Sequence, residues 1–154
     1  MINKIVGVLL LIILTACNSQ KKYSDFDYSY SRSGGYAPVY ENFLIKGKNA
    51  HYSFEGQGKN IKKDFKVTDA DIKMIEKSLS DNNFRMIQED YQKVYDNIAT
   101  IIKVNVGPNA ASKSDASFIM QKDMKKWKNI TDTFRLIIDK NVPQNTSTLQ
   151  TSER

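Results

Sequence analysis

Few side chains in this sequence could carry chemistry. The chain has one cysteine, Cys17, and one histidine, His51. Hydrolysis or group transfer needs a nucleophile beside a base, or a metal ion with several ligands. One histidine with no further thiol does not make a zinc site. We therefore expect no metal and no cofactor, and we interpret His51 as an ordinary strand residue, with a binding or proton-transfer role as the alternative.

Paired carboxylates are the other candidates, because two of them can hydrolyse a glycosidic bond. Asp69 and Asp71 are explained by the start of a helix, where the positive end of the helix dipole favours acidic side chains. Glu89 and Asp90 fit a solvated turn. We accordingly predict no catalytic residue and a protein that is not an enzyme, with a small carboxylate-dependent cell-wall hydrolase as the alternative.

Cys17 lies at the end of a segment typical of a secretory signal. Lys4 precedes an apolar run over residues 5–14, and this run is too short to cross a hydrocarbon core of ~30 Å as a helix. The ending Leu-Thr-Ala-Cys, residues 14–17, resembles the bacterial lipobox. That resemblance implies that residues 1–16 are a cleaved signal peptide and that Cys17 carries the lipid. A plain secretory signal is the alternative.

A lipid on Cys17 would hold the protein at a membrane, because two or more acyl chains together anchor a protein nearly permanently. Residues 17–24 are polar and aperiodic, which predicts a flexible tether. In lipoproteins of diderm bacteria an Asp after the cysteine commonly causes retention at the inner membrane, and here Asn18 holds that position. We expect a cell-envelope location at the outer membrane, facing the periplasm.

The chain has 154 residues and a formal net charge of +6. That length allows one domain, which we place at residues 25–142, followed by a disordered polar tail at 143–154. The basic balance suits anionic lipids or acidic polymers. We expect no nucleic-acid partner, since the chain shows no nucleic-acid-binding motif and its predicted address is exported.

Periodicity predicts the elements of this domain. Residues 25–32 alternate polar and aromatic side chains as a half-buried strand does, and two runs around Gly47-Lys48-Asn49 read as a β-hairpin. Residues 59–67 fit a further strand with lysines suited to a sheet edge. Thr68 fits an N-cap for a helix over 69–81.

The second half is less regular. Residues 84–97 fit a strand and turn or a ragged helix, and 99–107 predict a strand with Ile102, Val104 and Val106 on one face. A loop is expected at 107–114 and its partner strand at 116–121. The final helix is expected over 123–140, with an apolar stripe of Met124, Trp127, Ile130, Phe134 and Ile137. The predicted fold class is α+β, an antiparallel sheet packed by two amphipathic helices.

Two surfaces could bind a partner. Tyrosines crowd into the start of the domain, and their rings can stack on sugars or on a protein. The candidate contact residues are Tyr28, Tyr30, Tyr36 and Tyr40, for an envelope protein or a glycan, although strands favour tyrosine in any case. Lysines around Trp127 could lie on a membrane, but a core tryptophan fits the helical stripe better. A rigid loop at 107–115 would suit an inhibitor of a lytic enzyme.

The segment over residues 31–56 resembles the opening of an uncharacterised family of small bacterial envelope lipoproteins. In that family a Gly-x-x-Pro-x-Tyr element leads into a hairpin that ends in an aromatic residue, an acid and a glycine. The matching positions here are Gly35, Pro38, Tyr40, Phe54, Glu55 and Gly56. Family members often carry cysteines where this chain has Gly34 and Ala37. The resemblance implies the fold and the envelope address, and it transfers no catalytic residue.

Overall fold

The computed structural model describes residues 25–92 and 96–143. The predicted signal peptide, Cys17, the tether and residues 144–154 of the predicted tail lie outside these described ranges. The described part folds as a six-stranded antiparallel sheet with two α-helices, which confirms the α+β prediction.

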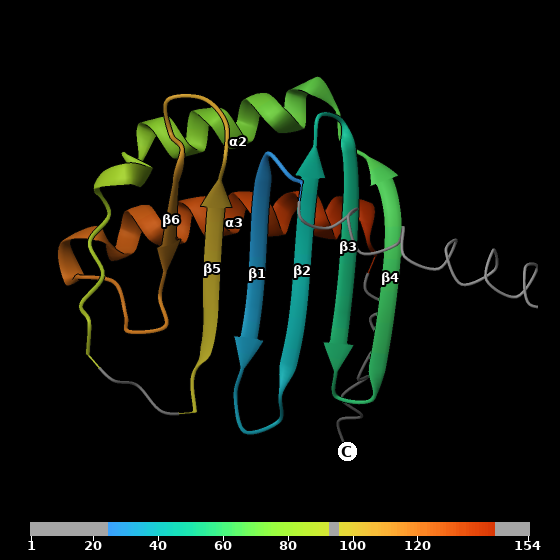
Figure 1. The fold of residues 1–154 in the computed structure, drawn as a ribbon, viewed down its shortest axis with the longest axis horizontal. Coiled ribbons are helices and arrows are strands. Elements are labelled where there is room, and N and C mark those ends of the chain that lie inside the picture. The colour runs from blue at the N-terminus through green and yellow to red at the C-terminus, as the bar shows by residue number, and fades with distance from the viewer. Residues whose placement is uncertain (1–24, 93–95, 144–154) are drawn as a thin grey trace, which may run out of the picture.

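Four strands follow one another as a meander, and two later strands extend the sheet (Figure 1). The spatial order is β4-β3-β2-β1-β5-β6, so the first strand is central and the edges are β4 and β6. The strand bounds are β1 Tyr28–Gly34, β2 Val39–Lys46, β3 Asn49–Gly56, β4 Lys59–Lys66, β5 Ile98–Val104 and β6 Ala111–Ser114.

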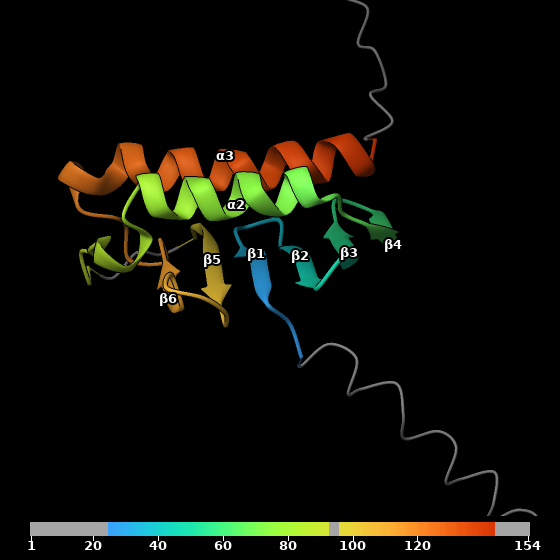
Figure 2. The same ribbon diagram turned by 90° about the horizontal axis from the view of Figure 1, so that it is seen from above.

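Alternation along the strands separates the two faces of the sheet. In β2 the side chains of Val39, Phe43 and Ile45 are buried, whereas the intervening Tyr40 and Asn42 are exposed. This period of two places one set of residues under the helices and the other on the opposite face. Both helices lie on the same side of the sheet and run across its strands (Figure 2). Within residues 25–92 and 96–143, the other face therefore has no helix over it, and we call it the face without helices.

Gly56 explains how the two halves of the family-like motif meet. A Cβ on Gly56 would lie 3.0 Å from the Pro38 carbonyl oxygen and 3.2 Å from Val39 Cα. Such contacts are tighter than most Cβ contacts, and they are with backbone atoms, so glycine lets the hairpin pack closely against the turn before β2. Gly34 has the same role at the end of β1, where a Cβ would lie 2.4 Å from the Asn97 carbonyl oxygen.

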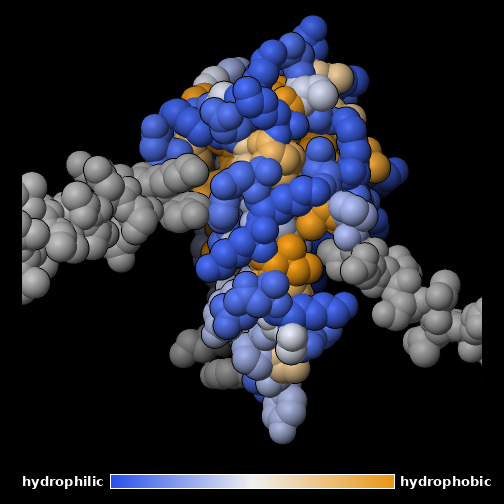
Figure 3. Space-filling model, turned by 90° about the vertical axis from the view of Figure 1, so that its right-hand side faces the viewer, coloured by the Kyte–Doolittle hydropathy of each residue, from blue (hydrophilic) through white to orange (hydrophobic). Residues whose placement is uncertain are grey.

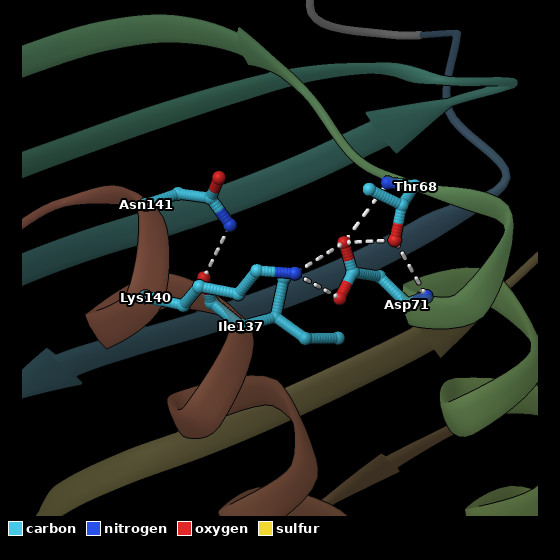
Figure 4. A network of polar contacts seen from close by, with 5 residues as sticks. All are labelled: Thr68, Asp71, Ile137, Lys140 and Asn141. Atoms are coloured by element: carbon cyan, nitrogen blue, oxygen red, sulfur yellow. Dashed lines mark hydrogen bonds and ion pairs between the residues drawn. The ribbon is translucent and has the colours of Figure 1, made fainter.

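The first helix, α2, spans Asp69–Asp81, as the sequence predicts. Thr68 caps it: the Thr68 Oγ1 accepts the Asp71 N–H at 3.1 Å, and the Asp71 carboxylate accepts the Thr68 N–H at 2.9 Å. The Lys140 Nζ also donates to Asp71 Oδ1, at 3.0 Å. Figure 4 shows this clasp, in which one buried carboxylate joins the start of α2 to the end of the other helix.

The second helix, α3, spans Met124–Asn141. Its buried stripe is Trp127, Ile130, Phe134, Ile137 and Ile138, whereas the predicted member Met124 is 51% exposed. The Phe134 ring stacks on Tyr30 with the centroids 5.6 Å apart. Met124 is the first residue of the helix and lines the pocket described below.

Two predictions for the segment after β5 are wrong, one of a loop and one of a strand. Ala111–Ser114, expected as loop, forms β6 against β5, and the expected strand at 116–121 contributes only an isolated bridge between Ile119 and Glu89. Phe118 has a φ of +67°, which a regular strand cannot include. The predicted inhibitory loop at 107–115 is thereby shortened, because four of its residues are held in the sheet. Residues 84–86 form a short 3₁₀ helix, and Val106 lies beyond β5.

The β4 edge fits the expectation of a charged edge strand. Four of its eight residues are lysines: Lys59, Lys62, Lys63 and Lys66. Seen from this edge, the surface is mostly hydrophilic with small apolar patches between (Figure 3). Lysines at an edge strand oppose pairing with another chain.

Candidate functional site

A pocket of about 890 Å³ opens between the first half of α3 and the sheet. Four separate stretches of sequence converge on it: β1, the segment around Asp90, residues 97–100 at the start of β5, and the continuous stretch 115–135 that leads into α3. The lining residues are Tyr30, Arg32, Asp90, Asn97, Thr100, Asp115, Phe118, Ile119, Gln121, Met124, Lys125, Trp127, Lys128, Thr131 and Arg135.

Asp115 fixes one wall of this pocket. Its Oδ1 accepts the Thr100 N–H at 2.5 Å and its Oδ2 accepts the Trp127 Nε1–H at 2.9 Å. Both carboxylate oxygens are therefore engaged, one by β5 and one by α3. The Trp127 side chain is held in place by this bond, and the residue is only 6% exposed.

Two other lining residues, Arg32 and Arg135, belong to a buried ionic cluster around Glu41. This residue is 1% exposed, and its Oε1 accepts hydrogen bonds from Tyr52 Oη at 2.8 Å and Arg135 Nη1 at 2.6 Å. Arg32 Nη1 donates to Glu41 Oε2 at 3.2 Å. A buried charge needs such partners, because an unpaired one is very costly. Two guanidinium groups are thus bound through one carboxylate at the edge of the pocket.

Tyr30 lies beside this cluster and lines the pocket. Burial raises the pKa of Tyr30 to about 12, and the negative charge of Glu41 acts in the same direction, against the smaller opposing influence of Arg32 and Arg135. The raised pKa keeps the phenol neutral, so Tyr30 adds no negative charge beside the two arginines.

Phe118 contributes an aromatic wall in an unusual conformation. Its φ of +67° is rare for a bulky residue, and its side chain is 51% exposed. Two backbone hydrogen bonds hold this turn, from Phe118 N to the Asp115 carbonyl oxygen and from Asp90 N to the Phe118 carbonyl oxygen, at 3.0 and 3.1 Å. Strained backbone of this kind is often found at ligand-binding positions.

The four predicted tyrosine contacts separate into two pairs. Tyr28 and Tyr30 are buried under the helices, at 5% and 2% exposure, which argues against contact with a protein partner there, whereas Tyr30 lines the pocket and so stays a candidate ligand contact. Tyr36, in the β1–β2 turn, is 96% exposed, and Tyr40 is 55% exposed. These two remain available to a partner. The alternation in the sequence put Tyr28 and Tyr30 on one face but could not say that helices cover that face.

The remaining candidate residues lie apart from one another. His51 is on the face without helices, where its Nδ1 lies 2.6 Å from Asp64 Oδ1 of β4. Asp71 caps α2, and Glu89 Oε1 accepts the Ser114 N–H at 2.8 Å. Asp90 is the one member of the predicted carboxylate pairs that lines the pocket. Within residues 25–92 and 96–143, no group of three or more His, Cys, Asp and Glu side chains is arranged to hold a metal ion.

The face without helices carries a smaller hollow of about 480 Å³. Its centre is lined by short polar side chains of neighbouring strands, because Ser31 pairs with Asn42 and Asn42 with Ser53. Longer side chains border it: Phe26, Leu44, His51, Lys62, Ile101 and Lys103. Tyr40 is on this same face, opposite Ser33 of β1.

Sequence reasoning missed Arg32, Glu41 and Arg135. A signal for the first two exists, because each is a charged residue at a position where the strand alternation expects an apolar one. An inward-facing charge in an alternating strand predicts a buried ion pair. Nothing in the sequence says that Arg135 is their third partner, since it comes from α3, far along the chain.

No known protein family and no curated protein matches this chain. Among the residues that the structure describes, no helix is long and apolar enough to cross a bilayer.

Proposed function

We propose that this protein is a bacterial cell-envelope lipoprotein, anchored through a lipid on Cys17, whose α+β domain is a non-enzymatic binding module. The observation that carries the binding role is the pocket between α3 and the sheet. Its volume lies within the range of small-molecule sites, which is roughly 300–1,000 Å³. Apolar walls with a few convergent polar groups are typical of such sites.

The anchor is supported by the sequence resemblance of residues 14–17 to the lipobox and by the family-like segment that follows. A lipid anchor predicts that the protein partitions into the detergent phase of a Triton X-114 extract. A Cys17→Ser variant should carry no acyl chains and should stay in the aqueous phase. Equal partitioning and equal mass of lipid on both proteins would contradict the anchor. An outer-membrane location facing the periplasm is tested by fractionation of the envelope.

The binding role is tested by native mass spectrometry of the full chain extracted from its own membrane. We expect a small molecule to copurify with the wild-type protein and to be lost from Thr131→Trp, which places an indole in the pocket. The matched control is Leu136→Trp, because Leu136 is on the same helix but 57% exposed and outside the pocket. Retention by Thr131→Trp, or an empty wild-type protein, would contradict the proposal.

A carboxylate-dependent cell-wall hydrolase is the second candidate, and one observation favours it: Asp90 and Asp115 line the same pocket. Against it, both oxygens of Asp115 are bound by Thr100 and Trp127. Turnover of cell-wall fragments that disappears in Asp90→Asn would establish the hydrolase and displace the binding module.

A further inference from the structure

We propose that the pocket binds a small amphiphile with one anionic head group and an apolar body, such as a long-chain carboxylate. The head group lies at Arg32 and Arg135, and the apolar body lies along Trp127 and Phe118. This inference rests on the proposed function, because it assigns a ligand class to the same pocket.

The charges at the arginine end of the pocket favour an anion. The guanidinium groups of Arg32 and Arg135 share one buried carboxylate, that of Glu41, so this cluster carries a surplus of one positive charge. Elsewhere in the lining, Lys128 is paired with Asp132, and the Asp115 carboxylate is engaged by protein donors. A local positive surplus beside low-polarity walls strengthens the attraction of an anion.

The two arginines retain capacity for a ligand. A guanidinium has five N–H donors in a planar fork. Arg32 reaches Glu41 through Nη1, as does Arg135, whose Nη2 also lies 3.6 Å from Asp139. Arg135 also interacts with the Tyr30 hydroxyl. The side chains of Arg32 and Arg135 are still 32% and 31% exposed, so neither is closed off by its protein partners. Glu41 fixes both groups in place, and a fixed fork loses less entropy when it binds a carboxylate.

The apolar wall fits the other end of such a molecule. Trp127 and Ile119 are buried at 6% exposure each, while Phe118 and Met124 are each 51% exposed. Half-exposed large apolar side chains gain stability when a ligand removes them from water. The strained φ of Phe118 keeps its ring at this opening. An aliphatic chain satisfies these contacts, whereas a sugar would leave its hydroxyl groups facing apolar carbon.

The decisive experiment uses two photoreactive probes that differ only in the head group: hexadecanoic acid and hexadecanol, each with a diazirine at the same chain position. The full chain in phosphatidylcholine vesicles is labelled with each probe, and peptide mass spectrometry locates the labels. We expect the acid to label the peptides that contain Phe118 and Trp127 about tenfold more than the alcohol does, because ionic hydrogen bonds to the head group are lost with the alcohol.

Variants separate the head-group contact from the fold. We expect labelling by the acid to fall about tenfold in Arg32→Gln and to be partly restored in Arg32→Lys, while the exposed Arg85→Gln control stays unchanged. Thr131→Trp should abolish labelling, because the indole fills the pocket while the charged residues of the pocket are unchanged. Thermal unfolding of each variant shows whether the fold is kept. If labelling by the acid falls as far in Arg32→Lys as in Arg32→Gln, the head-group contact is contradicted.

The outcomes distinguish the two proposals. Equal labelling of the pocket by acid and alcohol would overturn the anionic ligand and leave the binding module in place. No pocket labelling by either probe, with Thr131→Trp indistinguishable from the wild type, would overturn both. Competition by free hexadecanoate supports a free carboxylate ligand, and competition only by vesicles containing phosphatidylglycerol supports a lipid head group as the source of the anion.

Discussion

The two halves of α3 use the same helix for different purposes. In the C-terminal half, Phe134, Ile137 and Ile138 are fully buried, and the Asp71–Lys140 clasp closes the end of the layer. In the N-terminal half, Trp127 and Ile130 are buried, but Met124 and Lys128 are exposed and a pocket opens between this part of the helix and the sheet. Stability is concentrated where side chains interdigitate, and a ligand can enter only where they do not. We therefore call residues 134–141 of α3 the packed half, and we infer that residues 124–131, the recognition half, contribute to ligand binding.

The largest effect is expected from Phe134→Ala in the packed half. Phe134 is fully buried and stacks on Tyr30, so its truncation leaves a cavity and should lower the free energy of unfolding by about 3–5 kcal/mol. Urea denaturation measures this difference. Met124→Ala, the counterpart in the other half, should change stability by less than about 1 kcal/mol. Similar losses at both positions would remove the distinction between the two halves.

The next effect is expected at the junction of the halves, where Glu41 holds Arg32 and Arg135. Glu41→Gln keeps the shape but removes the charge, which leaves two guanidinium groups without their carboxylate and should cost about 3 kcal/mol. Urea denaturation again measures it. Restoration of stability by Arg135→Met in the Glu41→Gln background would show that the loss comes from the unpaired charge. An unchanged midpoint in Glu41→Gln would mean that the cluster contributes nothing.

The clasp at the packed end predicts a pH dependence. Burial alone would raise the pKa of Asp71, but hydrogen bonds from Thr68 and Lys140 outweigh it and lower the pKa below the ordinary value of 3.8. A lowered folded-state pKa stabilises the protein above about pH 4, and this contribution is lost as pH falls through the folded-state value. Asp71→Asn should therefore cost about 1 kcal/mol at pH 7 and progressively less below pH 4. Thermal melts followed by circular dichroism measure the stability difference between Asp71→Asn and the wild type. A difference that is as large at pH 2 as at pH 7 would contradict the prediction.

In the recognition half, Phe118→Asn should separate stability from binding. Asparagine adopts φ above zero more readily than phenylalanine, so the melting temperature should stay the same or rise slightly. Ligand binding should weaken, because the aromatic wall is lost. Trp127 fluorescence reports on the pocket directly, since it is the only tryptophan of the chain. A variant that melts much lower, or that binds as the wild type does, would contradict a recognition role for this strained residue.

The smallest effect on stability is expected on the exposed tyrosines. Replacing Tyr36 and Tyr40 together with alanine should change the free energy of unfolding by less than about 0.5 kcal/mol, because both side chains are in solvent. If they contact an envelope protein or glycan, a cross-linking pull-down from intact envelopes should lose that partner in the double variant. Intact capture would restrict the binding module to its pocket.

Sequence patterns predicted the first four strands, the hairpin around Gly47, the capped helix over 69–81 and the final helix. Each depends on local rules: alternation, turn residues, an N-cap and a helical apolar stripe. They failed at β6, whose residues Ala-Ser-Lys-Ser carry no strand signal of their own. That segment is a strand because the edge of β5 offers it unpaired backbone groups, which is a property of the assembled sheet.

The sequence by itself determined the α+β class and which side chains of each strand share a face. Both follow from the repeat of apolar residues along the chain, every two residues in a strand and about every 3.6 in a helix. Which face the helices cover, and hence that Tyr28 and Tyr30 are core while Tyr36 and Tyr40 are surface, was decided by tertiary packing. The pocket was decided there too. Arg32, Glu41 and Arg135 are brought together from β1, β2 and α3, and only the burial of Glu41 makes their ionic contacts obligatory.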